Sequence, residues 1–143
     1  MARIDGAGSR PLKSQDQGPC IIEGERMSSI ERLEIGPRMS QAVIHNGVVY
    51  LAGQVADDAV GASVATQTAN ILKKIDALLK AAGSDKSKLL SARVWLTDMR
   101  KFDEMNKVWD AWVIQGQTPT RVCVEAKLAA PEYTVEILVI AAR

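Results

Sequence analysis

The patterned part of this chain begins with short stretches in which apolar and polar residues alternate. Residues 38–44 and 48–52 alternate with the period of two that is typical of strands. The dipeptide Asn46-Gly47 lies between them and predicts a tight hairpin, because both residues tolerate the left-handed backbone that such turns require. Residues 32–35 fit a short leading strand of the same sheet.

Two longer segments have the apolar spacing of helices. Residues 63–82 carry one continuous apolar stripe, with Ser63 as the expected N-cap and Gly83 as the expected left-handed residue at the end. Residues 99–113 form a second candidate helix that Asp98 would cap. Its aromatic side chains recur at helical spacing, which favours core packing over a platform for stacking nucleobases. The apolar positions of the two segments are Val64, Thr68, Ile71, Leu72, Ile75, Leu78, Leu79 and Ala82, then Phe102, Met105, Trp109, Trp112 and Val113.

Three further strands are expected at residues 89–97, 121–127 and 133–141, with Pro131 breaking the pairing before the last of them. Two helices can cover only one face of so wide a sheet, yet the last strand is apolar on both faces. The residues of its two faces are Val135, Ile137 and Val139 on one, and Leu138 and Ile140 on the other. Because the sequence offers no third helix, we expect a second copy of the chain to cover the open face.

The pattern changes at Met27. Residues 1–26 show no apolar period and are rich in glycine and proline, which predicts a flexible N-terminal tail in front of one folded domain at residues 27–143. The tail lacks the apolar core of a secretory signal, and Met27 is an alternative start. No apolar run approaches the length that spans a bilayer, so we expect no membrane association.

The charge and the cysteine and histidine content of the chain indicate which binding partners and which kinds of site to expect. Eighteen basic and seventeen acidic residues leave a net charge of +1, which provides no general attraction for nucleic acid. Two cysteines, Cys20 and Cys123, are too few for a disulfide scaffold and suit free thiols in a reducing cytoplasm. The single histidine, His45, flanks the predicted hairpin turn and is expected to be solvated, so a metal site or a histidine-dependent nucleophile is not expected.

Two charged residues lie on strands that are otherwise mostly apolar. Arg121 opens a strand and shares a face with Cys123 and Glu125, and Glu136 is the lone acid of the last strand. A cross-strand or interface ion pair is one explanation for both. The other is chemical: a guanidinium is the natural receptor for a small carboxylate, and a nearby acid can position or deprotonate water. Such a pair would need neither a metal nor an organic cofactor.

The sequence resembles the Rid family, the reactive intermediate deaminases also called YjgF-like proteins, from about residue 30 to residue 143. The most specific match is the Pro-x-Arg strand followed by the Val-Glu-Ile strand. The matching strings are Gly36-Pro37, Ser40-Gln41-Ala42, Leu51-Ala52-Gly53-Gln54-Val55, Trp95-Leu96-Thr97-Asp98, Met105-Asn106, Thr118-Pro119-Thr120-Arg121, Val135-Glu136-Ile137 and Ile140-Ala141.

The resemblance implies an α+β fold similar to chorismate mutase of the bacillus type, with a single mixed sheet and two helices on one face. It also implies a homotrimeric barrel with sites in the clefts between subunits. In family members, the arginine at the position of Arg121 grips the carboxylate of 2-aminoacrylate or its imine tautomer, and the acid at the position of Glu136 helps to orient or activate water. Hydrolysis then gives a 2-keto acid and ammonia, with no cofactor.

The resemblance adds Gly53, Cys123, Asn106 and Met39 as substrate-binding positions. Three of these positions have a plainer alternative: Gly53 permits close backbone approach, Cys123 fills packing volume, and Asn106 hydrogen-bonds a loop. Met39 replaces a tyrosine of the archetype, and Ala52 replaces a serine. These replacements keep a second function open, a non-catalytic oligomer of the same fold that binds small carboxylates or acts like a chaperone. Ribonuclease activity, attributed to some members, fits the neutral charge poorly.

Overall fold

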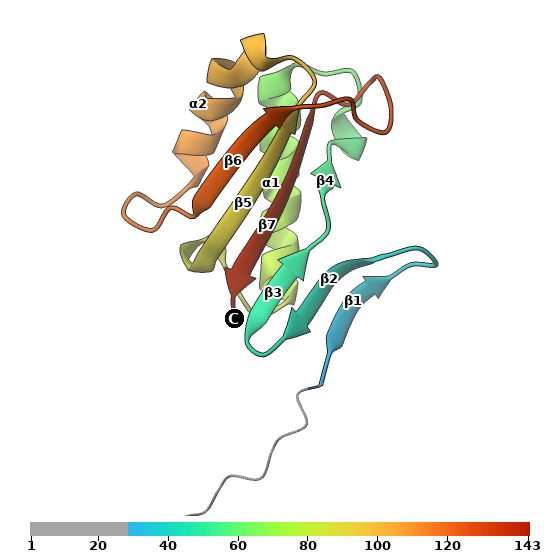
Figure 1. Ribbon diagram of the computed structural model, residues 1–143, viewed down its shortest axis with the longest axis vertical. Helices are drawn as coiled ribbons and strands as arrows, with labels where there is room; N and C mark the ends of the chain where they lie inside the picture. Colours follow the sequence, from blue (N-terminus) through green and yellow to red (C-terminus); the bar gives the residue numbers. More distant parts are fainter. Residues whose placement is uncertain (1–28) are drawn as a thin grey trace, which may run out of the picture.

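The computed structural model describes residues 29–143, so the expected tail at residues 1–26 and Cys20 lie outside the described residues. One mixed sheet and two α-helices make up the fold (Figure 1). The strands are β1 (Glu31–Ile35), β2 (Ser40–His45), β3 (Val48–Leu51), β4 (Gln54–Val55), β5 (Leu89–Leu96), β6 (Thr120–Glu125) and β7 (Val135–Ala142). The helices are α1 (Val64–Ala81) and α2 (Phe102–Trp112), with 3-10 turns η1 (Asp57–Ala59), η2 (Lys86–Lys88) and η3 (Met99–Lys101).

The sheet has the strand order β1-β2-β3-β7-β5-β6, with β4 also paired to β7. Only β5 and β6 run parallel, and every other pair is antiparallel. Both helices pack against one face and enclose the core (Figure 1). The α+β fold with one mixed sheet and two helices on one face is therefore confirmed.

The hairpin between β2 and β3 forms as predicted. Asn46 and Gly47 both have positive φ angles, 50° and 74°, as the primed hairpin turn requires. His45 pairs with Val48 at the end of β2 and is half-buried rather than fully solvated, with its Nε2 bonded to the Asn46 amide.

The predicted ends of α1 are also confirmed. The Ser63 hydroxyl accepts a hydrogen bond from the amide of Thr66, and Gly83 has a φ of 78° just beyond the helix. Asp98, however, caps η3 rather than α2, because its side chain accepts from the Arg100 amide and the chain turns once as a 3-10 helix first. The Glu125 carboxylate holds this turn by accepting from the amide of Met99 at 2.9 Å. As a result, α2 begins three residues later than its apolar spacing suggests.

A buried glutamine ties the start of α1 to the loop before β7. The Gln67 side chain is fully buried and donates to the carbonyls of Ala62 and Glu132, at 3.1 and 2.9 Å. Its own oxygen accepts from the amide of Thr134 at 2.9 Å. The Glu132 carbonyl also accepts from the amide of Gly61, whereas the Ala62 carbonyl and the Thr134 amide would lose their hydrogen-bond partner without this side chain. Gln67 therefore helps to fix where β7 enters the sheet.

As predicted, the helices cover only one face of β7. Val135, Ile137, Val139 and Ala141 are fully buried against the helices, whereas the alternate residues are half-buried on the open face. Neighbouring strands add apolar side chains to the open face, and the most exposed of these are Val122 at 50%, Tyr50 at 45% and Val124 at 43%. One chain thus leaves an apolar sheet face uncovered. No helix in the described part of the chain is long and apolar enough to cross a membrane.

Candidate active site

Arg121 lies on the edge strand β6, on the face that the helices cover. It pairs with the buried Ala92 of β5, and paired residues of neighbouring strands share a face. Its Nη1 donates to Oδ1 of Asn106 on α2 at 2.8 Å. The guanidinium also lies over two aromatic rings of α2, 5.3 Å from the centroid of Trp109 and 5.7 Å from that of Phe102. The edge strand and the helix together therefore hold this cation in one place.

The spacing of α2 explains this arrangement. Phe102, Asn106 and Trp109 follow one another at intervals of four and three residues, so they lie on one side of the helix and face β6. The guanidinium makes no ion pair within residues 29–143, and its Nε and Nη2 have no hydrogen-bond partner among these residues. One edge of the guanidinium thus stays available for two parallel hydrogen bonds to a carboxylate.

Cys123 follows Arg121 on the same face and is half-buried. Burial raises the pKa of its thiol, and the nearby Arg121 charge lowers it by less. The group is therefore a neutral thiol at neutral pH, and not an activated nucleophile.

Glu136 lies on β7 and points to the opposite face of the sheet. It pairs with Trp95 of β5 and with Val55 of β4, whereas the residues on either side of it along β7 are buried under the helices. Burial raises the pKa of this carboxyl, and it forms no ion pair within residues 29–143. Within residues 29–143, neither Arg121 nor Glu136 forms the cross-strand ion pair that is one explanation for these two charges, and the alternative of an interface ion pair stays open.

Gly53 lies directly beneath the Glu136 carboxylate. A Cβ on Gly53 would overlap Oε1 of Glu136 and lie 3.2 Å from its Cδ. Only a glycine leaves room for the carboxylate in its present position, where Gly53 precedes β4 and β4 pairs with β7 at Glu136. Gly53 and Glu136 thus form one local unit.

The predicted site residues fall into two groups. The arginine group contains Arg121, Asn106 and Cys123 on β6 and α2, and the glutamate group contains Glu136 and Gly53 on β7 and just before β4. The two groups lie on opposite faces of one sheet. Met39 lies in the turn between β1 and β2, where it is 47% exposed. A single chain therefore does not bring Arg121 and Glu136 to one small substrate.

Comparison with known proteins places the chain in a family. Residues 30–143 match the family model described as Endoribonuclease L-PSP. The chain is 44% identical over 114 residues to the RutC family protein YoaB of Escherichia coli K12, covering 80% of this chain and 98% of that protein. The chain therefore belongs to this family, which is also called the Rid or YjgF family.

Solved Rid structures share the fold. A YjgF family member from Neisseria meningitidis is 46% identical, with a TM-score of 0.78 over 80% of this chain and 95% of that one. A Rid family protein of unknown function from Yersinia pestis is 30% identical, with a TM-score of 0.70 over 81% of this chain and 99% of that one.

Two features of this Rid chain were not predicted as site elements. Phe102 and Trp109 were assigned to the core because their spacing is that of a buried helix face, and only the packing of α2 on β6 shows that they also flank Arg121. Trp109 belongs both to the core and to the site, since its side chain is only 5% exposed and its ring faces the Arg121 guanidinium. Within residues 29–143, no group of three or more histidine, cysteine, aspartate or glutamate side chains is arranged to hold a metal ion.

Proposed function

We propose that this protein hydrolyses reactive 2-imino acids of the 2-aminoacrylate type to 2-keto acids and ammonia. The observation that carries the proposal is the Arg121 guanidinium. It is held by Asn106 and two aromatic rings, it has no carboxylate partner among the described residues, and it keeps one edge free. A half-buried guanidinium with one free edge is a receptor for a small carboxylate. Two parallel hydrogen bonds both bind the carboxylate and fix its orientation.

The proposed reaction adds water across the C=N bond next to the bound carboxylate. Glu136 takes a proton from the water as the new C–O bond forms and passes it to the imine nitrogen, which gives a neutral carbinolamine. Glu136 then takes the proton of the carbinolamine hydroxyl as the C=O bond forms and passes it to the nitrogen as the C–N bond breaks, which releases ammonia. Burial raises the pKa of Glu136, which makes its carboxylate a better proton acceptor than an exposed one.

The site is completed by a second copy of the chain in this proposal. The arginine group and the glutamate group lie on opposite faces of one sheet, so one protomer would supply Arg121 and its neighbour would supply Glu136. The uncovered face with Tyr50, Val122 and Val124 supports the association. We infer a homotrimer whose sheets pack together and whose clefts hold the sites, as the family resemblance implies.

A non-catalytic carboxylate-binding oligomer is the second candidate. The observation that favours it is the pair of replacements at Met39 and Ala52, which put a thioether and a methyl group where the archetype has two hydroxyls. The net charge of +1 gives no support to an RNA substrate, although the family description contains the word endoribonuclease.

The experiment generates imines in situ with an amino-acid oxidase and follows release of the keto acid. Wild type should accelerate the release for at least one amino acid of a panel, and Arg121→Ala should lose the acceleration. Arg100→Ala removes an arginine whose side chain is 90% exposed and should behave as wild type. Equal rates for wild type and Arg121→Ala across the panel would refute the hydrolase. Calorimetric binding of a 2-keto acid without any turnover would instead establish the second candidate.

A further inference from the structure

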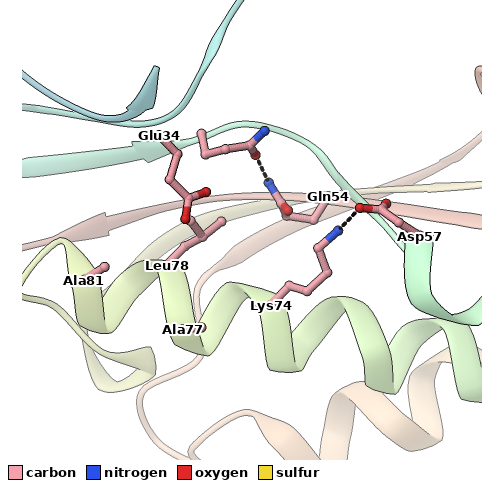
Figure 2. Close-up of a pocket in the computed structure, with 8 residues that line it drawn as sticks. Glu34, Gln54, Asp57, Lys74, Ala77, Leu78 and Ala81 are labelled. Carbon is pink, nitrogen blue, oxygen red and sulfur yellow. Dashed lines mark hydrogen bonds and ion pairs between the residues drawn. The ribbon is translucent and has the colours of Figure 1, made fainter. Parts of the chain in front are cut away.

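A cavity separate from the proposed imine site lies between α1 and the strands β1, β2 and β4 (Figure 2). Its volume is about 320 Å³, within the range of small-molecule sites. Neither the arginine group nor the glutamate group lines it. The lining residues are Glu34, Gln41, Gln54, Asp57, Lys74, Ala77, Leu78 and Ala81.

Gln54 is the buried polar group of this cavity. It is 4% exposed, and its Nε2 donates to Oε1 of Gln41 at 2.9 Å and to the carbonyl of Ala52 at 3.1 Å. These two bonds use both protons of the amide and fix its orientation. The remaining oxygen, Oε1, receives no hydrogen bond from residues 29–143, and the side chain lines the cavity (Figure 2). An acceptor that opens onto the cavity can take a hydrogen bond from a ligand there.

The charged residues that line the cavity also favour a ligand that donates hydrogen bonds. Lys74 already has two hydrogen-bond partners, because its Nζ donates to Oδ2 of Asp57 and to the carbonyl of Val55, both at 2.8 Å. Glu34 makes no ion pair within the described residues, so two carboxylates face one ammonium group. The Glu34 backbone is left-handed, with a φ of 47°, and regular pairing with β2 is interrupted between Leu33 and Ile35. The cavity therefore has a net negative lining and an excess of acceptors.

The floor of the cavity is apolar and elongated. Ala77, Leu78 and Ala81 follow Lys74 along α1, so the Lys74–Asp57 pair lies at one end and Glu34 lies toward Leu78 at the other (Figure 2). Four helical residues rise about 6 Å, a length that an alkyl chain of about four or five carbons spans. Such a chain would lie on the Leu78 side chain with polar groups at its ends.

We propose that this cavity binds an aliphatic amine, most favourably a diamine, independently of the imine site. One ammonium group contacts the Glu34 carboxylate and donates to Oε1 of Gln54, and the alkyl chain lies on Ala77 and Leu78. A second ammonium group reaches the free oxygen of Asp57. Anions are excluded, because the one cation of the lining is already paired.

The test is isothermal calorimetry with 1,4-diaminobutane and 1,5-diaminopentane, and with succinate as the anionic comparison. Wild type should bind the diamines and not succinate. Glu34→Gln should weaken binding by about tenfold or more, since it removes a charge-assisted hydrogen bond. Ala77→Phe should abolish binding by filling the cavity. Asp58→Asn removes the same charge from a residue outside the lining and should bind like wild type.

Three outcomes would overturn the proposal. The first is no diamine binding by wild type up to about 10 mM, a concentration that detects even millimolar affinity. The second is unchanged binding by Glu34→Gln and Ala77→Phe when thermal melting shows that both variants fold. The third is tighter binding of succinate than of the diamines. Arg121→Ala should keep diamine binding, which separates this site from the proposed hydrolase.

Discussion

Substitution of Gly53 by alanine perturbs the proposed site with one methyl group. The new Cβ would overlap Oε1 of Glu136 and lie 3.2 Å from Cδ, whereas carbon atoms in contact lie about 3.5–4.0 Å apart. The Glu136 carboxylate must therefore move by about 1 Å, which it can do by rotating its own side chain at a cost of about 1 kcal/mol or less. A catalytic group misplaced by about 1 Å loses about 100-fold in rate. We expect Gly53→Ala to fold almost as stably as wild type and to be about 100-fold less active.

The assay measures kcat and KM for keto-acid release together with the free energy of unfolding in urea. The loss should fall on kcat, because the Arg121 carboxylate receptor lies on the other face of the sheet and is unchanged. Glu136→Ala provides the control background. Because Gly53→Ala acts through the carboxylate, the double variant should be no slower than Glu136→Ala alone. A full additional loss in the double variant, or a Gly53→Ala enzyme as active as wild type, would refute the reasoning.

Three further predictions follow from other contacts. Gln67→Leu should lower the free energy of unfolding by about 2–4 kcal/mol in urea titrations, because it leaves the Ala62 carbonyl and the Thr134 amide without their hydrogen-bond partner. Burial raises the pKa of Glu136, so the folded state binds that proton more tightly than the unfolded chain does, and ionisation costs stability as pH rises. Glu136→Gln should therefore be more stable than wild type at about pH 8, with the difference gone at about pH 4. Asn106→Ala should raise KM for the imine more than it lowers kcat, because it frees the guanidinium that orients the carboxylate; an unchanged KM would contradict that role.

The local features of the fold could be predicted because short-range chemistry determines them. Asn46-Gly47 forms the expected turn, and Ser63 and Gly83 end α1 as expected. β4 was missed because two residues, Gln54 and Val55, are too short for any period to appear. The late start of α2 depends on Glu125, a residue far along the chain, which no local pattern contains.

The site was predictable as a set of residues but not as an arrangement. The lone charges at Arg121 and Glu136 stand out on mostly apolar strands. Their faces, however, depend on pairing with Ala92 and Trp95 of β5, and that register arises only in the assembled sheet. For the same reason, the role of Trp109 beside Arg121 could not be separated from its role in the core.

Mixed oligomers test the central claim most directly, namely that Arg121 of one protomer and Glu136 of another complete one imine-hydrolysing site. Arg121→Ala and Glu136→Ala chains should each be nearly inactive in keto-acid release. Co-expressed in equal amounts, they should regain about a quarter of the wild-type activity, because random assembly pairs an intact Arg121 with an intact Glu136 in about one cleft of four. A mixed preparation, shown by mass spectrometry to contain hybrid oligomers, that is no more active than its parents would contradict the account.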